Sequence, residues 1–179
     1  MTAEMALIAA VRLLGSLPVL RWPFFGGVFA IAVDQSDLFI MNLVDLGGVR
    51  DYQAFDKYLD QAYMLAFLAV AARWQGPERI VAVALYCFRL AGFLAFELTQ
   101  DRDILLLFPN LFEFWFLFVA GRRQFGLEER LKGRGLAVIL VLLAALKVFQ
   151  EYAIHQERWL DGFTAVEAVQ AIWDWILPF

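Results

Sequence analysis

Long apolar stretches recur along this chain and are separated by short polar connections. A spanning helix needs about 20 mostly apolar residues. Five stretches have that length and character: 22–44, 53–73, 79–98, 103–121 and 135–153. A Gly-Pro pair breaks the pattern after the second stretch, and a polar turn follows the third. The pattern predicts an all-α integral membrane protein, a bundle of about five transmembrane helices.

Two shorter apolar segments flank these spans. Residues 5–20 include Arg12 and Pro18, and residues 163–177 place tryptophan and aliphatic residues among acidic and amide side chains. Amphipathic segments with tryptophan anchors are typical of helices that lie in the membrane interface. We therefore expect interfacial helices at both ends of the bundle, and residues 1–179 as a single transmembrane helical domain.

Composition agrees with a membrane location. Apolar residues make up 62% of the chain and the mean hydropathy is +0.64, whereas soluble domains are about 45–50% apolar. The single Cys87 and the single His155 exclude a disulfide framework and any metal site built from several histidines or cysteines. No basic leader with a cleavage site opens the chain, so we expect no cleaved signal peptide. The net charge of −4 argues against a nucleic-acid partner.

The basic residues gather on one side of the predicted bundle. They are Arg12, Arg21, Arg73, Arg79, Arg122, Arg123, Arg130, Lys132 and Arg134. With its acidic residues that side carries a net +5, and the rest of the chain carries −9. Lysine and arginine mark the cytoplasmic side of a membrane protein. We therefore expect a multi-pass protein of the cell (inner) membrane, with a cytoplasmic N-terminus and the C-terminus outside.

Polar side chains recur inside the spans at helical spacing. The candidates for a ligand- or cation-binding site are Asp34, Asp37, Asp56, Asp60, Arg89, Glu97, Asn110, Glu113, Lys147 and Glu151. Residues three or four apart share one face of a helix, and the predicted topology places the set in the outer half of the bilayer. A charge near the centre of a spanning helix costs about 2.5–3.5 kcal/mol. These side chains should therefore face one another or water.

Carboxylates outnumber bases within this set, so it cannot neutralise itself. Carboxylate oxygens favour protons or hard cations such as Mg²⁺, Ca²⁺ or Mn²⁺. The first hypothesis is an outward-facing acidic pocket that binds or transports a cation or a cationic ligand. The second is a divalent-metal-dependent membrane enzyme that acts on a lipid head group. The third is a small non-catalytic subunit of a larger membrane complex, or a homo-oligomer, in which a partner completes the acidic set.

Structural roles stay open for several of the same residues. Arg89, and Lys147 with Glu151, can be ion pairs that fix helix packing. Asn110 follows Pro109 and can satisfy backbone groups that the proline frees. Tyrosines within the spans, including Tyr63, are expected to be packing residues.

The acids of the first two spans resemble the paired-aspartate layout of the CDP-alcohol phosphotransferases. Asp34-Gln35-Ser36-Asp37 is followed by Asp56-Lys57-Tyr58-Leu59-Asp60, at a separation close to that of the family. The resemblance covers under 30 residues. It implies that the four aspartates hold divalent metal on two consecutive helices. The chain has Leu38 where the family has glycine and Met41-Asn42 where it has Ala-Arg, and the family's site opens to the cytoplasm.

Overall fold

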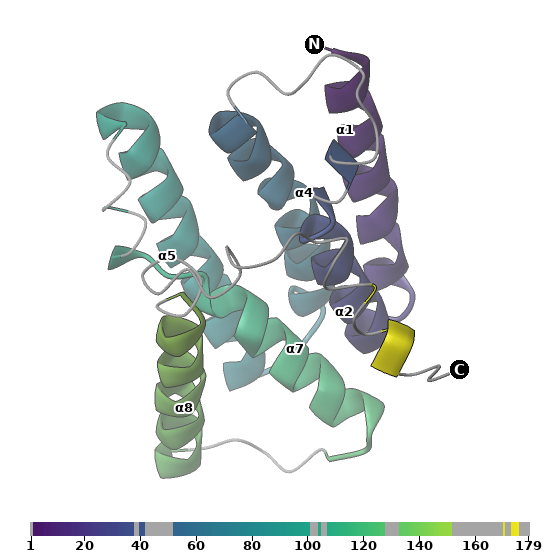
Figure 1. Cartoon of the computed structure of the whole chain (residues 1–179). Coiled ribbons are helices and arrows are strands. Elements are labelled where there is room, and N and C mark those ends of the chain that lie inside the picture. The colour runs from purple at the N-terminus through teal and green to yellow at the C-terminus, as the bar shows by residue number, and fades with distance from the viewer. Residues whose placement is uncertain are drawn as a thin grey trace.

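The structure is a computed structural model that describes residues 2–37, 40–41, 52–100, 104, 107–127, 133–151, 170 and 173–175, with only the backbone of 52–54 and 151. Within these residues it is helical, without strands. The elements are α1 (Ala3–Ser16), the 3₁₀ helix η1 (Leu17–Leu20), α2 (Pro23–Asp34), α4 (Tyr52–Ala71), α5 (Pro77–Thr99), α7 (Leu111–Gln124) and α8 (Gly133–Glu151). Figure 1 shows how they are arranged.

Local sequence explains where several helices begin. The Thr2 hydroxyl accepts a hydrogen bond from the backbone N–H of Met5 at 3.2 Å, which caps α1. Proline opens both α2 and α5, where its fixed φ suits the first helical turn and no hydrogen bond is lost. Gly76, just before α5, has a φ of +66°, a conformation that favours glycine over other residues.

Three helical segments are long and apolar enough to cross a membrane: Ala3–Leu20, Pro77–Thr99 and Gly133–Gln150. The last two match the third and fifth predicted spans. The helix α4 follows the second predicted span, but it carries several charged residues in its first half. The structure therefore confirms a helical chain with three segments that could cross a membrane. It does not confirm the predicted bundle of five spans.

Two predicted spans are shorter than expected. The first does not continue as one helix to residue 44, because α2 ends at Asp34 and a turn at Gln35 and Ser36 follows. The Ser36 hydroxyl donates to the carbonyl of Val33 at 2.6 Å, a local bond that competes with helix continuation. The fourth does not start at residue 103, because α7 begins at Leu111, after Pro109.

The predicted interfacial helix at residues 5–20 corresponds to α1 and η1, whose combined segment Ala3–Leu20 is also long and apolar enough to cross a membrane. The helix α1 packs along α2 and α4 (Figure 1). The reason is Arg12, which is buried and needs counter-ions that only the other helices supply. The second predicted interfacial helix, at residues 163–177, lies outside the described residues except for 170 and 173–175, which are helical.

The helix α7 packs against α2, α4, α5 and α8. Its buried aromatic side chains meet those of α4. The ring of Phe116 stacks on Phe67 at 3.9 Å and on Trp74 at 5.4 Å between centroids. The buried face of α4 therefore changes character along its length, from aspartates near its start to aromatic rings near its end.

A network of charges lies beyond the end of α4, where α5 begins and α7 ends. We call Glu78, Arg122 and Arg123 the Glu78 network. Glu78 pairs with Arg122 at 3.5 Å and with Arg123 at 2.6 Å. The guanidinium of Arg123 also lies 5.4 Å from the ring of Trp74. The network holds the start of α5 against the end of α7.

Candidate functional site

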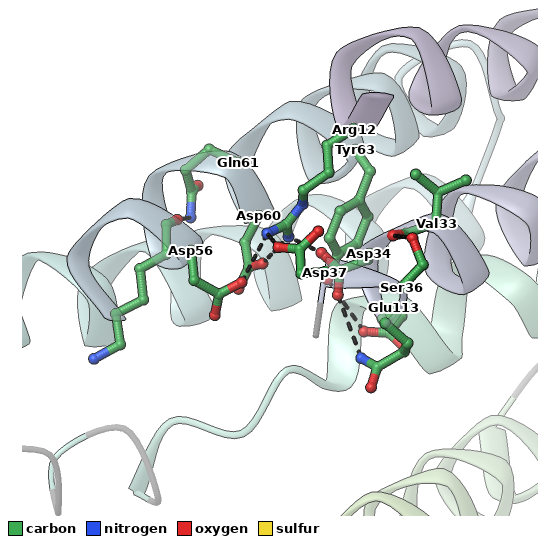
Figure 2. Close-up of polar contacts among 12 residues, drawn as sticks. Arg12, Val33, Asp34, Ser36, Asp37, Asp56, Asp60, Gln61, Tyr63 and Glu113 are labelled. Atoms are coloured by element: carbon green, nitrogen blue, oxygen red, sulfur yellow. Dashed lines mark hydrogen bonds and ion pairs between the residues drawn. The ribbon is translucent and has the colours of Figure 1, made fainter. Parts of the chain in front are cut away.

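Four aspartates surround the guanidinium group of Arg12 where α1, α2 and α4 meet (Figure 2). Arg12 Nη1 donates to Asp37 Oδ2 at 2.9 Å and to Asp56 Oδ1 at 2.7 Å. Arg12 Nη2 donates to Asp60 Oδ1 at 2.6 Å and forms an ion pair with Asp34 Oδ1. We call these five residues the aspartate cluster.

Three short segments position the acids of the cluster. Asp34 is the last residue of α2, and Asp37 follows the turn that ends this helix. Asp56 and Asp60 are four residues apart in α4, so both lie on one face of that helix. The turn after α2 therefore brings its two carboxylates to the face of α4 that carries the other two.

A close approach between α1 and α2 brings Arg12 to the acids. Gly15 lies one turn after Arg12, and a Cβ at this glycine would come within 2.8 Å of Val33 Cγ1. Real side chains do not approach so closely, so a larger residue would move α1 away from α2. Glycine at this position therefore sets the distance between Arg12 and Asp34.

Arg12 leaves most of the acidic charge uncompensated. It contacts one oxygen of each aspartate, and the fully ionised cluster carries four negative charges against one positive charge. Asp37 is 1% exposed, and its Oδ1 has no hydrogen-bond partner among the residues that the structure describes. Buried polar atoms are usually paired, so such an atom calls for a partner such as an ion or a water molecule.

One carboxylate oxygen from each of three aspartates is close enough to the other two to share one ion. Oxygens of Asp34, Asp56 and Asp60 all lie within 4.8 Å of one another. The Asp56 side chain is 34% exposed, so the cluster opens to its surroundings at this residue. The arrangement thus has a closed end at Asp37 and an accessible end at Asp56.

Asn110 and Glu113 form a separate group with Tyr63. Asn110 Nδ2 donates to Glu113 Oε2 at 3.1 Å and to the Tyr63 hydroxyl at 3.3 Å. The Tyr63 hydroxyl donates to Glu113 Oε2 at 3.3 Å. Tyr63 therefore does more than pack, since it ties α4 to the start of α7. It lies three residues after Asp60, so the group is the next step along the same face of α4.

The other predicted site residues make separate contacts. Arg89 Nη1 donates to the carbonyl of Phe108 at 2.8 Å. Glu97 accepts a hydrogen bond from the hydroxyl of Tyr58 at 3.1 Å in an exposed position. Lys147 Nζ donates to Gln150 at 2.9 Å. The side chain of Glu151, its other predicted partner, lies outside the described residues. The nine candidates whose side chains are described thus divide between the aspartate cluster, the Tyr63 group and separate contacts.

Arg12 is the residue that sequence reasoning assigned to the wrong place. It was counted with the basic residues on the cytoplasmic side, whereas the structure buries it among the four aspartates. One signal could have indicated this. Arg12 lies within an apolar stretch of helix, and Gly15, three residues later, is typical of close helix contact.

Comparison with protein families, with curated proteins and with solved structures gives no match for this chain. The resemblance to the CDP-alcohol phosphotransferases therefore rests on the aspartate spacing alone.

Proposed function

We propose that the aspartate cluster binds a cation within a helical membrane protein, with Arg12 as a fixed internal charge beside the ligand. One observation carries the proposal: Arg12 uses only one oxygen of each aspartate, and the buried second oxygen of Asp37 has no hydrogen-bond partner among the described residues. Several carboxylates in one buried place repel one another unless positive charge or protons reach them. A second cation supplies that charge.

The donor set favours a hard divalent cation. Every candidate ligand atom is a carboxylate oxygen, which suits Mg²⁺, Ca²⁺ or Mn²⁺. Oxygens that surround one Ca²⁺ lie about 2.3–2.6 Å from it. Three oxygens within 4.8 Å of one another are compatible with a single ion at such distances. Asp56, the most exposed of the four acids, gives the ion a way in.

The membrane location is part of the same proposal. Three apolar helical segments support it, as do large exposed apolar side chains along α8, among them Val141, Leu146 and Phe149. With the basic end of the bundle in the cytoplasm, the aspartate cluster lies toward the outer side. If α1 spans the membrane, its first residue then lies outside, which reverses the orientation expected from sequence for the N-terminus.

Calorimetric titration of Mn²⁺ into the detergent-solubilised protein tests the proposal. We expect saturable binding by the wild type and at least tenfold weaker binding by Asp34→Asn. Glu97→Gln is the matched control, because it removes a carboxylate of the predicted set that lies outside the cluster. Absence of binding at millimolar Mn²⁺, or equal weakening by both variants, would overturn the proposal.

A second candidate is metal-dependent chemistry on a lipid head group. The convergence of two aspartate pairs from α2, the turn after it and α4 favours this candidate, because the phosphotransferase resemblance implies that layout. It predicts Mn²⁺-dependent transfer of the lipid phosphoryl group from a CDP-linked lipid to an acceptor alcohol: the hydroxyl oxygen bonds to phosphorus, the pyrophosphate bond breaks, cytidine monophosphate leaves, and the hydroxyl proton passes to solvent. Wild-type protein that binds Mn²⁺ but never turns over such a lipid would leave cation binding as the function and exclude this candidate.

A further inference from the structure

A basic side chain of α4 lies on an aromatic ring of α5. The ammonium Nζ of Lys57 is 3.2 Å from the centroid of the Phe96 ring. Phe96 is buried, with 6% of its surface exposed, and Lys57 is half-buried. The face of an aromatic ring attracts a cation at this distance, and the attraction is stronger where water is excluded. The contact therefore gives the charge of Lys57 a favourable place on α5.

Neighbouring contacts fix the two helices around this pair. The next residue of each helix takes part in a hydrogen bond, in which the Tyr58 hydroxyl donates to Glu97 Oε2 at 3.1 Å. The Tyr58 ring also meets the Phe93 ring edge-on, with 5.6 Å between centroids. Phe93 lies one turn before Phe96 in α5. These contacts set the register of α4 against α5, and the ring of Phe96 is part of that packing.

Lys57 also lies close in sequence to the acids that α4 contributes to the aspartate cluster. It follows Asp56 directly and precedes Asp60 by three residues. Side chains three residues apart are neighbours on a helix surface. The flexible stem of a lysine can bring its ammonium group to such a neighbour. A Lys57 bound to Asp60 would add a second base to the cluster and would occupy a carboxylate that the proposed cation needs.

We propose that Phe96 is a positioning residue for the cation site, because its ring holds the charge of Lys57 away from Asp60. The four ion pairs of the aspartate cluster all run to Arg12. With Lys57 on the ring, the cluster therefore keeps four acids against one base, an excess that favours a divalent cation. The inference rests on the proposed cation binding and adds a residue outside the cluster that sets its affinity.

Calorimetric titration of Mn²⁺ into the detergent-solubilised full-length protein tests the inference. Phe96→Leu removes the ring but keeps an apolar side chain, and it should weaken Mn²⁺ binding about fivefold, the size of a partly buried cation–π contact. Phe96→Tyr keeps a ring and should bind like the wild type. Phe93→Leu is the matched control, since it removes a ring of α5 that meets Tyr58 instead of Lys57.

A second substitution separates positioning from packing. Lys57→Met added to Phe96→Leu should restore the Mn²⁺ affinity of the wild type, because no ammonium group is left to reach Asp60. Lys57→Met alone should change the affinity less than twofold. Loss of packing around Phe96 would not be reversed by removing a charge from α4.

Several results would overturn the inference. Equal affinities of the wild type and Phe96→Leu would exclude a role for the ring and would leave the proposed function intact. A loss that Lys57→Met does not reverse would assign Phe96 to packing alone. If Phe96→Leu does not fold, Lys57→Met alone decides: a gain of fivefold or more would show that Lys57 already acts on the aspartates. Absence of Mn²⁺ binding by the wild type would overturn the proposed function, and this inference with it.

Discussion

Two ion-pair networks near opposite ends of α4 have opposite compositions. The aspartate cluster has one base among four acids, whereas the Glu78 network has one acid between two bases. The Arg12 side chain is 2% exposed, but that of Arg123 is 40% exposed. Water and salt solvate excess charge where a network is exposed, as at Arg123. Arg12 and Asp37 have little such help, so the excess charge around them is the stronger indication of a bound ion.

The sharpest test of this contrast is Arg12→Met. It leaves four carboxylates without a buried counter-ion, and we expect a loss of about 3–5 kcal/mol in the free energy of unfolding. Thermal unfolding in detergent with a chelator measures the loss, and millimolar Mn²⁺ should restore part of it. Arg21→Met, at an exposed position, is the control. A variant that melts like the wild type without metal would show that the cluster is not held by charge.

Asp37→Asn should separate stability from ligand binding. The amide oxygen can still accept the hydrogen bond from Arg12, and one uncompensated charge disappears. Without metal we expect stabilisation by about 1 kcal/mol, or about 2–4 °C in the midpoint of unfolding. The affinity for Mn²⁺ should fall at least tenfold. A variant that loses stability without metal while keeping its Mn²⁺ affinity would contradict the proposed role of Asp37.

Tyr63→Phe tests whether burial also determines how much an uncharged hydrogen-bond partner of an acid, here Glu113, contributes to stability. Glu113 loses the Tyr63 donor in a buried position, and we expect a cost of about 1–2 kcal/mol in unfolding free energy. Tyr58→Phe is the matched control, because it removes the hydroxyl that donates to Glu97 at an exposed position. Equal losses in chemical denaturation would mean that burial does not distinguish the two tyrosines.

The smallest effect is expected in the Glu78 network. A double-mutant cycle of Glu78→Gln and Arg123→Gln should give a coupling energy of about 0.2–1 kcal/mol. Salt at 1 M should reduce it further, since the Debye length is then about 3 Å. Thermal unfolding at low and high salt measures both values. A coupling above that range, unaffected by salt, would place this network in the same class as the aspartate cluster.

Helical spacing predicted part of this arrangement and could not predict the rest. Asp34 could be predicted to lie beside Asp37, and Asp56 beside Asp60, because spacing within a segment fixes which residues point the same way. Spacing does not determine which helices are neighbours, so Arg12 was placed with the basic residues of the cytoplasmic side, away from the aspartates. For the same reason Asn110 and Glu113 were grouped with the aspartates, although Tyr63 holds them in a group of their own.

The fold, like the site, could be predicted from the sequence only in part. Apolar length identified α5 and α8 closely, since little interrupts either helix. The predicted spans are longer than α2 and α7. A turn at Ser36 follows the end of α2, and Pro109 precedes the start of α7. The sequence also predicted an interfacial helix at residues 5–20, because a lone arginine in a short apolar segment is typical of a surface helix. The acids that bury this arginine lie more than 20 residues away along the chain.

The contact at Gly15 has an evolutionary consequence. A single methyl group there would come within 2.8 Å of Val33 Cγ1 and would move α1 outward. Short bonds from Arg12 to the aspartates would then lengthen, and water could enter between them. A homologue could therefore keep every charged residue of the cluster and still lose the site through one apolar substitution. Glycine at this position is thus a marker of a functional homologue alongside the four acids.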